Sequence, residues 1–403
     1  MADRALSHRD ASATGSPFEV LAAFARLGVT CFGGPIAHIG YFQDEFVARR
    51  GWLSDRAFAD LVALCQFLPG PASSQVGFSI GLLRAGYFGG LAAWTGFTLP
   101  SAILMVLFAY GAAFLGGLVG QGVLHGLKLV AVAIVAQAVW SMARTLAPDR
   151  ERATIAAAAA VLILLVHSTI APLLVIVAGG IAGWRVCRMA GATSDGTLGL
   201  PVSRRVGITA LSLFLLLLAG LPLLHRLGVP GVNEFDAFYR AGALVFGGGH
   251  VVLPLLRDTV VAPGWIDENA FLAGYGAAQA LPGPLFTFSA YLGAVIAGVP
   301  GAVLALIAIF LPGILILLGT LPFWDDFRKR RGAQAAMRGI NAAVVGILAA
   351  ALYNPLWVSA VKGAPDFALA LVAFALLTVW RAPPIVVVAL AVGGGIAIGE
   401  IAR

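Results

Sequence analysis

Groups that could bind an anion occur twice in this chain, at matching positions. Residues 66–71 read Gln-Phe-Leu-Pro-Gly-Pro, and residues 279–284 read Gln-Ala-Leu-Pro-Gly-Pro. Two prolines around a glycine end one helix and start another, because proline lacks an N–H and fits the first helical turn. The free N–H groups and positive dipole end of the second half-helix form an anion site, to which hydroxyls add donors. The candidate ligands are Pro71, Ser73 and Ser74 in the first copy, and Pro284 and Thr287 in the second.

A pair of glycines precedes each Pro-Gly-Pro motif. The pairs are Gly33 with Gly34 and Gly247 with Gly248, each directly after a phenylalanine. A backbone without side chains can approach a small ligand closely. The alternative is a kink or a packing contact, since glycine and proline are common in membrane helices. Recurrence at matching positions in two apolar halves favours a substrate site.

One arginine precedes each glycine pair within an otherwise apolar stretch. Arg26 and Arg240 each lie six residues before the phenylalanine of their Phe-Gly-Gly sequence. A charge at membrane depth is expensive and by default indicates a functional site. Two guanidinium groups related by a repeat would suit a tetrahedral divalent oxyanion through bidentate hydrogen bonds. The alternative is that each side chain snorkels to the headgroups, or pairs with Glu19 and with Glu234 or Asp236.

Four further polar residues are candidates for the pathway or for proton coupling: His250, Lys128, Gln66 and Gln279. His250 could contact the anion or carry a proton, although a packed, hydrogen-bonded histidine is the commoner role. Lys128 lies at helical spacing from His125 and lines either the pathway or its interfacial end. Each glutamine lies three residues before a proline, where freed helix carbonyls would satisfy its amide, which favours structural support.

The elements that must position these residues are membrane helices. Hydrophobic residues make up 60% of the chain, charged residues 11%, and the mean hydropathy is +0.93, outside the range of soluble proteins. Apolar runs long enough to cross a bilayer include 88–116, 121–143, 205–224 and 299–323. The three cysteines have neither metal-site nor disulfide spacing, and no cofactor or metal is expected. The net charge of +7 sits in loops, which indicates membrane topology and not a nucleic-acid partner.

The recurring motifs define two repeats. Residues 18–190 form the first repeat and 229–403 the second, with an offset that drifts only from 214 to 212. The tail 1–17 is expected to be cytoplasmic, and 191–203 is a polar linker. The hydrophobic helix 204–228 has no counterpart, so it would supply the extra crossing that inverts the second repeat.

Loop charges support the inversion. Loop 43–56 is basic whereas its counterpart 257–269 is mainly acidic, and 144–152 holds three arginines. Because cytoplasmic loops collect Lys and Arg, equivalent loops should lie on opposite sides, with 43–56 and 144–152 in the cytoplasm. Segments 18–42 and 57–84 then enter and leave on one side. The predicted fold is an all-α integral membrane protein of two inverted repeats, with broken or re-entrant helices around a central substrate site. Full crossings are expected near 88–115, 121–143, 152–167, 169–187, 204–228, 299–323, 333–358, 365–380 and 383–400.

These motifs resemble those of the chromate ion transporter family in its long, two-domain form. The resemblance covers the chain from about residue 18 onwards. It implies a multi-pass protein of the bacterial-type inner (plasma) membrane that exports chromate and confers chromate resistance, with sulfate as a competing anion. The residues that carry it are those at 32–35, 51–53, 66–71, 246–250, 264–265 and 279–284.

Other functions remain open on the sequence. An importer or exchanger of sulfate or another oxyanion would use the same site, because tetrahedral dianions differ little in shape. An integral-membrane enzyme acting on lipid-linked phosphate would need clustered acids or a metal site, and the chain has no such motif. Walker and dinucleotide motifs are absent, so ATP-driven transport is not expected. The favoured function is a secondary transporter without catalytic residues, working by alternating access in the lipid bilayer, with a homodimer and the coupling ion left open.

Overall fold

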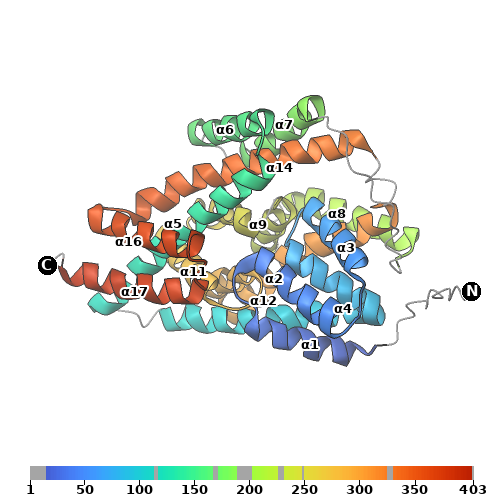
Figure 1. Ribbon diagram of the computed structural model, residues 1–403, viewed down its shortest axis with the longest axis horizontal. Coiled ribbons are helices and arrows are strands. Elements are labelled where there is room, and N and C mark those ends of the chain that lie inside the picture. Colours follow the sequence, from blue (N-terminus) through green and yellow to red (C-terminus); the bar gives the residue numbers. More distant parts are fainter. Residues whose placement is uncertain are drawn as a thin grey trace, which may run out of the picture.

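The computed structural model describes residues 15–112, 117–166, 171–187, 202–225, 231–246, 249–324 and 330–401. Within these ranges every regular element is a helix (Figure 1). Five helices are long and apolar enough to cross a membrane: Ala72–Gly111, Gly120–Leu146, Arg204–Leu224, Leu285–Phe323 and Arg331–Ala360. The chain is therefore an all-α, multi-pass membrane protein, as its composition predicts.

The first half begins at a capped helix. The Ser16 hydroxyl accepts a hydrogen bond from the Glu19 N–H at 3.1 Å, and Pro17 occupies the first turn of α1. Ser54 caps α3 in the same way through the Ala57 N–H. The elements of this half are α1 (Pro17–Thr30), α2 (Gly34–Phe42), the π-helical η1 (Gln43–Arg49), α3 (Asp55–Phe67), α4 (Ala72–Ala112), α5 (Gly117–Leu146), α6 (Arg150–Leu165) and α7 (Ala171–Val186).

The second half repeats this series after α8 (Arg204–His225). Asp267 caps α11 through the N–H groups of Asn269 and Ala270, at the position equivalent to Ser54. The elements of this half are α9 (Val232–Ala243), η2 (Gly249–Val251), α10 (Val252–Leu256), the π-helical η3 (Arg257–Val261), α11 (Glu268–Ala280), η4 (Leu285–Thr287), α12 (Phe288–Thr320), η5 (Leu321–Phe323), α14 (Arg331–Ala351), η6 (Leu352–Trp357), α15 (Val358–Ala360), α16 (Ala364–Thr378) and α17 (Pro384–Ile401).

The two long broken helices have the same kink. In α4 the backbone leaves the helical region at Ala85 (φ −144°, ψ 29°) and Gly86 (φ 64°, ψ −160°). In α12 it does so at Ala297 (φ −143°, ψ 27°) and Gly298 (φ 65°, ψ −155°). A positive φ of this kind favours glycine, which has no Cβ to clash. The kinks coincide with the boundaries expected after residues 84 and 298, and two such equal departures show that the halves share one local fold.

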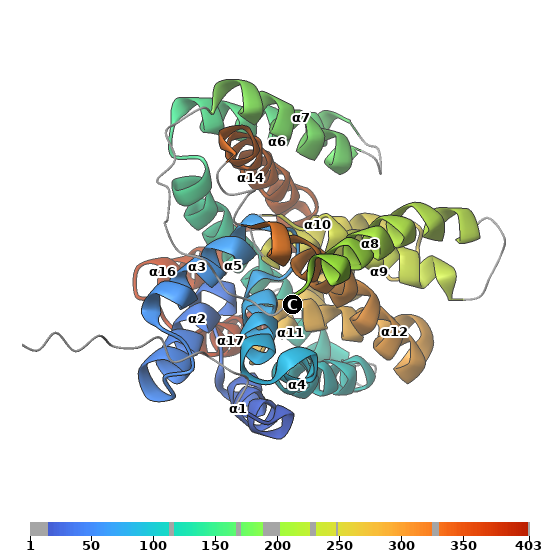
Figure 2. The ribbon, with the colours of Figure 1, turned by 90° about the vertical axis from the view of Figure 1, so that its right-hand side faces the viewer.

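Each half lends a helical hairpin to the other. The α6–α7 hairpin packs on α14, and the equivalent α16–α17 hairpin packs on α5 (Figures 1 and 2). Gly126 of α5 contacts the backbone of Ala391 in α17, and the equivalent Gly339 of α14 contacts the backbone of Gly179 and Gly183 in α7. Small residues let these helices approach to backbone contact. Each half is therefore packed against the other through the same pair of elements.

Parts of the predicted organisation stay predictions. Most of the tail 1–17 and of the linker 191–203, and the end of the unpaired helix 204–228, lie outside the described residues, as do Gly247 and Gly248. The repeat boundaries 18–190 and 229–403 and the inversion of the second repeat also stay predictions. The described helix α8 occupies most of the predicted unpaired segment.

Candidate functional site

Both Pro-Gly-Pro motifs break the helix in which they lie. α3 ends at Phe67 and α4 begins at Ala72, directly after Pro71. α11 ends at Ala280 and is followed after Pro284 by the short helix η4. The glycines between the prolines, Gly70 and Gly283, have φ values of 115° and 96°. The first N–H groups of each new helix have no intrahelical acceptor, so two helix N-termini are available to a ligand.

Each break is hydrogen-bonded to the opposite half. The Gly70 N–H donates to the Val245 carbonyl at 2.7 Å, and the Gly283 N–H donates to the Cys31 carbonyl at 2.9 Å. Val245 and Cys31 both lie directly before a Phe-Gly-Gly sequence. The two donors are equivalent in the repeat, and so are the two acceptors. The breaks and the ends of the glycine segments therefore meet where the halves face each other.

Buried hydroxyls surround this meeting point. Ser101 Oγ and Thr287 Oγ1 lie 2.8 Å apart, and Thr287 also donates to the Pro284 carbonyl at 2.8 Å. Both hydroxyl residues are buried. Ser101 comes from α4 of the first half, so this hydrogen bond also joins the two halves. Ser101 directly follows Leu99-Pro100, which recurs as Leu311-Pro312 in the second half. This recurrence is the sequence signal that could have identified Ser101.

The first break has its own polar support. Gln75 donates to the Pro69 carbonyl at 2.9 Å and to the Gly313 carbonyl at 3.0 Å, so its amide spans both halves. His38 Nδ1 lies 3.4 Å from Ser73 Oγ, and both residues are buried. Neither Gln75 nor His38 stood out in the sequence, because neither lies in a repeated motif.

Several buried polar atoms at the breaks have no partner among the described residues: His38 Nε2, Ser74 Oγ, Gln75 Oε1 and Gln279 Nε2. Ser74 is 5% exposed, and its Oγ makes no hydrogen bond there. The Gln279 Nε2 is also buried without a partner. Ser74 is the repeat counterpart of Thr287, and both residues are buried. A buried unsatisfied donor calls for a ligand or a water molecule.

The two arginines lie on α1 and α9, which are not the helices that contain the breaks. Arg26 is exposed on α1. Arg240 pairs with Asp236 at 2.7 Å, one turn earlier on α9, and donates to the Leu218 carbonyl of α8 at 3.2 Å. The ion-pair alternative for Arg240 is thus present in the structure. No recorded hydrogen bond or ion pair of the described residues joins either guanidinium to the breaks, and their role as substrate ligands stays a prediction.

The remaining candidates take varied positions. His250 Nδ1 lies 2.8 Å from the Tyr275 hydroxyl, in the packed arrangement that is commoner for a histidine. Lys128 donates to the Asn269 side chain at 3.0 Å. Gln66 is exposed. Gly33 and Gly34 both have positive φ, at 99° and 78°, where α2 begins.

Comparison with known proteins gives the family. A family model described as chromate transporter matches residues 18–184 and again residues 232–397. A probable chromate transport protein of Synechococcus elongatus is 27% identical, over 92% of this chain and 93% of the relative. Chromate transport proteins of Cupriavidus metallidurans (88% of this chain, 86% of the relative) and Pseudomonas aeruginosa (82% and 79%) are also 27% identical. No solved structure matches the chain.

These matches agree with the molecular architecture. The family model matches once in each half and leaves out α8. The family is one of transporters and not of enzymes. This all-α, multi-pass membrane protein belongs to the chromate transporter family.

Proposed function

We propose that this protein exports chromate across the inner membrane as a secondary transporter, and that this export confers chromate resistance. The supporting observation is the pair of reciprocal hydrogen bonds from Gly70 to Val245 and from Gly283 to Cys31. They hold two helix N-termini together between the halves. Chromate transport proteins are also among the relatives of this chain.

The proposed substrate site is lined by neutral donors. Helix N-terminal N–H groups after Pro71 and Pro284 would meet the oxygens of the anion, with the hydroxyls of Ser73 and Ser74 beside them. The Thr287 hydroxyl would join them by turning its proton from the Pro284 carbonyl to the anion. A chromate dianion offers oxygen acceptors in every direction and needs no acceptor from the protein. Sulfate has the same shape and charge, so this site accepts sulfate as a competitor.

The proposed mechanism is alternating access. The breaks lie between two halves that share one local fold, and rocking one half against the other would open this region to each side in turn. Placing the second half upside down relative to the first makes the two openings face opposite sides. Export of a dianion from a negative-inside cell is favoured by roughly 2.3 kcal/mol per charge per 100 mV.

Everted membrane vesicles test this function directly. Chromate uptake is measured with and without sulfate and with an imposed potential. Saturable chromate accumulation that sulfate suppresses is the expected result. Sulfate flux without chromate flux would change the substrate and keep the site, whereas the absence of both fluxes would overturn the proposal.

A further inference from the structure

Two cavities outside the breaks are equivalent in the repeat. The first, of about 940 Å³, is lined by Gly33, by Ser141 and Arg144 of α5, and by Thr378 and Arg381 at the end of α16. We call it the first vestibule. It joins the glycine segment of one half to the loop of the hairpin that the other half supplies.

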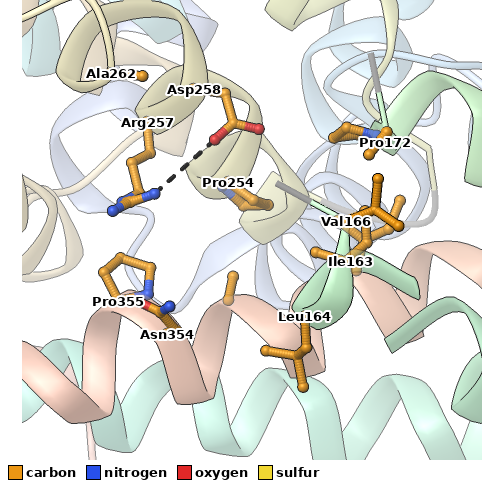
Figure 3. A pocket seen from close by; sticks show the side chains of 13 residues that line it. Ile163, Leu164, Val166, Pro172, Pro254, Arg257, Asp258, Ala262, Asn354 and Pro355 are labelled. Atoms are coloured by element: carbon orange, nitrogen blue, oxygen red, sulfur yellow. Dashed lines mark ion pairs between the residues drawn. The ribbon is translucent and has the colours of Figure 1, made fainter. Parts of the chain in front are cut away.

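The second vestibule, of about 290 Å³, uses the equivalent elements (Figure 3). Asn354 occupies the position equivalent to Ser141, and Ala171 the position equivalent to Pro384, which also lines the first vestibule. Pro254 and Arg257 come from the segment after the second glycine pair. The two cavities therefore occupy equivalent places in the two halves.

The two vestibules differ in charge. Arg144 and Arg381 are exposed, the described lining of the first vestibule includes no acidic residue, and neither arginine has an ion pair among the described residues. In the second vestibule Arg257 lies 4.0 Å from Asp258 and forms two hydrogen bonds with Glu268, at 2.9 and 3.0 Å. The first vestibule therefore attracts anions, whereas the charge of Arg257 in the second is neutralised.

Arg381 occupies a position that usually belongs to glycine. Its φ is 51°, and the N–H of the following Ala382 donates to the Leu376 carbonyl at 2.9 Å, which ties the segment after α16 back to that helix. A residue with a Cβ pays in strain for this left-handed conformation. Arg381 thus lines the cavity although its left-handed backbone conformation is unfavourable for a residue with a Cβ.

The geometry points to the first vestibule as an anion-recruiting site that feeds the breaks with tetrahedral divalent oxyanions. This inference rests on the proposed transport function and adds the side from which the substrate is captured. Arg144 begins the basic stretch 144–152, which the positive-inside rule assigns to the cytoplasm. Two unpaired positive charges in a cleft concentrate anions there, and salt screens the effect.

The test compares four variants in everted vesicles, whose outer face is cytoplasmic. Arg381→Gly removes the charge and relieves the backbone strain, and Arg144→Gln removes the other charge. Arg381→Lys keeps the charge, and Arg150→Gln removes a nearby arginine that does not line the cavity. Initial chromate uptake is measured over a range of concentrations at low and high ionic strength.

Arg381→Gly and Arg144→Gln are expected to raise KM about tenfold at low ionic strength, with Vmax unchanged, and the difference should shrink in high salt. Arg381→Lys and Arg150→Gln should keep the wild-type KM. A wild-type KM for both neutral variants at low salt, or a loss of Vmax alone, would overturn the proposal that the first vestibule recruits anions. Absence of uptake by the unmodified protein would overturn the transport function itself, which keeps the two failures distinct.

Discussion

His125 Nε2 of α5 and a carboxylate oxygen of Asp366 of α16 lie 2.7 Å apart, and this hydrogen bond fastens the α16–α17 hairpin to the first half. Asp366 is 4% exposed. Its second oxygen accepts the Lys362 N–H at 2.8 Å, so both carboxylate oxygens are satisfied. The pair joins residues that are 241 positions apart in the chain.

Removing Asp366 should loosen this hairpin. We expect Asp366→Ala to lower the free energy of unfolding by about 1–3 kcal/mol, because it leaves the Lys362 N–H and the His125 ring without this acceptor. His125→Ala should cost less, since His125 is 24% exposed and the Lys362 bond survives. Thermal unfolding in detergent measures both. Lys362→Ala is the control, because its backbone N–H remains; an equal loss from all three changes would contradict the role of the pair.

A side chain at the second break should disrupt its position. A Cβ on Gly283 would lie 3.0 Å from Ser101 Cβ, and its φ of 96° is unfavourable for alanine. We expect Gly283→Ala to destabilise the fold by about 1–3 kcal/mol and to lower chromate uptake. Gly111→Ala, where a Cβ meets nothing within 4 Å, is the matched control. Normal uptake by Gly283→Ala at normal abundance would show that the break tolerates displacement.

The hydrogen bond between Ser101 and Thr287 can be tested with an isosteric change. Thr287→Val keeps the shape but leaves the Ser101 hydroxyl without this partner, at a cost of about 1–3 kcal/mol. We expect uptake to fall and sulfate competition to weaken. Thr287→Ser, which keeps the hydroxyl, should behave as wild type. If sulfate inhibits chromate uptake by the valine variant as strongly as it inhibits uptake by the serine variant, Thr287 does not contact the anion.

The reciprocal hairpin packing predicts paired effects. Gly339→Ala would push a Cβ into the Gly179 carbonyl and the backbone of Gly183. Gly126→Ala would do the same against Ala391. Each should cost about 1–3 kcal/mol of stability, because the helices cannot approach as closely. Gly393→Ala on α17 meets nothing within 4 Å and should be neutral. If melting curves in detergent show that only one of these two substitutions lowers the stability, the two hairpins do not pack in the same way.

Acid should destabilise the segment after α2 through Glu45. Burial tends to raise the pKa of Glu45, but the hydrogen bond from Arg50 and the charges of Arg50 and Arg49 outweigh it and lower that pKa below 4.5. The stabilisation is therefore complete above pH 4.5 and is lost as the pH falls through the lower folded value. Glu45→Gln should flatten the acid limb of the melting-temperature profile, and exposed Glu400→Gln should not. Parallel profiles for wild type and Glu45→Gln would refute this.

The sequence predicted the features that depend on local chemistry. Proline and glycine fix where a helix breaks, so both Pro-Gly-Pro breaks and the boundaries near residues 84 and 298 were readable from residue types alone. The ion pair between Arg240 and Asp236 was also readable, because the residues lie one helical turn apart. Each of these follows from spacing along one segment.

Features that depend on folding across the chain were not readable. The hairpin exchange, the bond from Ser101 to Thr287 and the amide bridge of Gln75 join segments that are far apart in sequence. The expected crossings 152–167 and 365–380 agree with α6 and α16, which have 16 and 15 residues, fewer than the roughly 20 of a typical crossing. Hydropathy marks an apolar run but does not show whether the run packs on a helix of the other half.

The hairpin exchange also constrains biosynthesis. Ribosomes deliver α5 long before α16 and α17, so the first half stays incomplete until nearly the last residue has been made. A premature stop that deletes only these last two helices would therefore damage the half that was translated first.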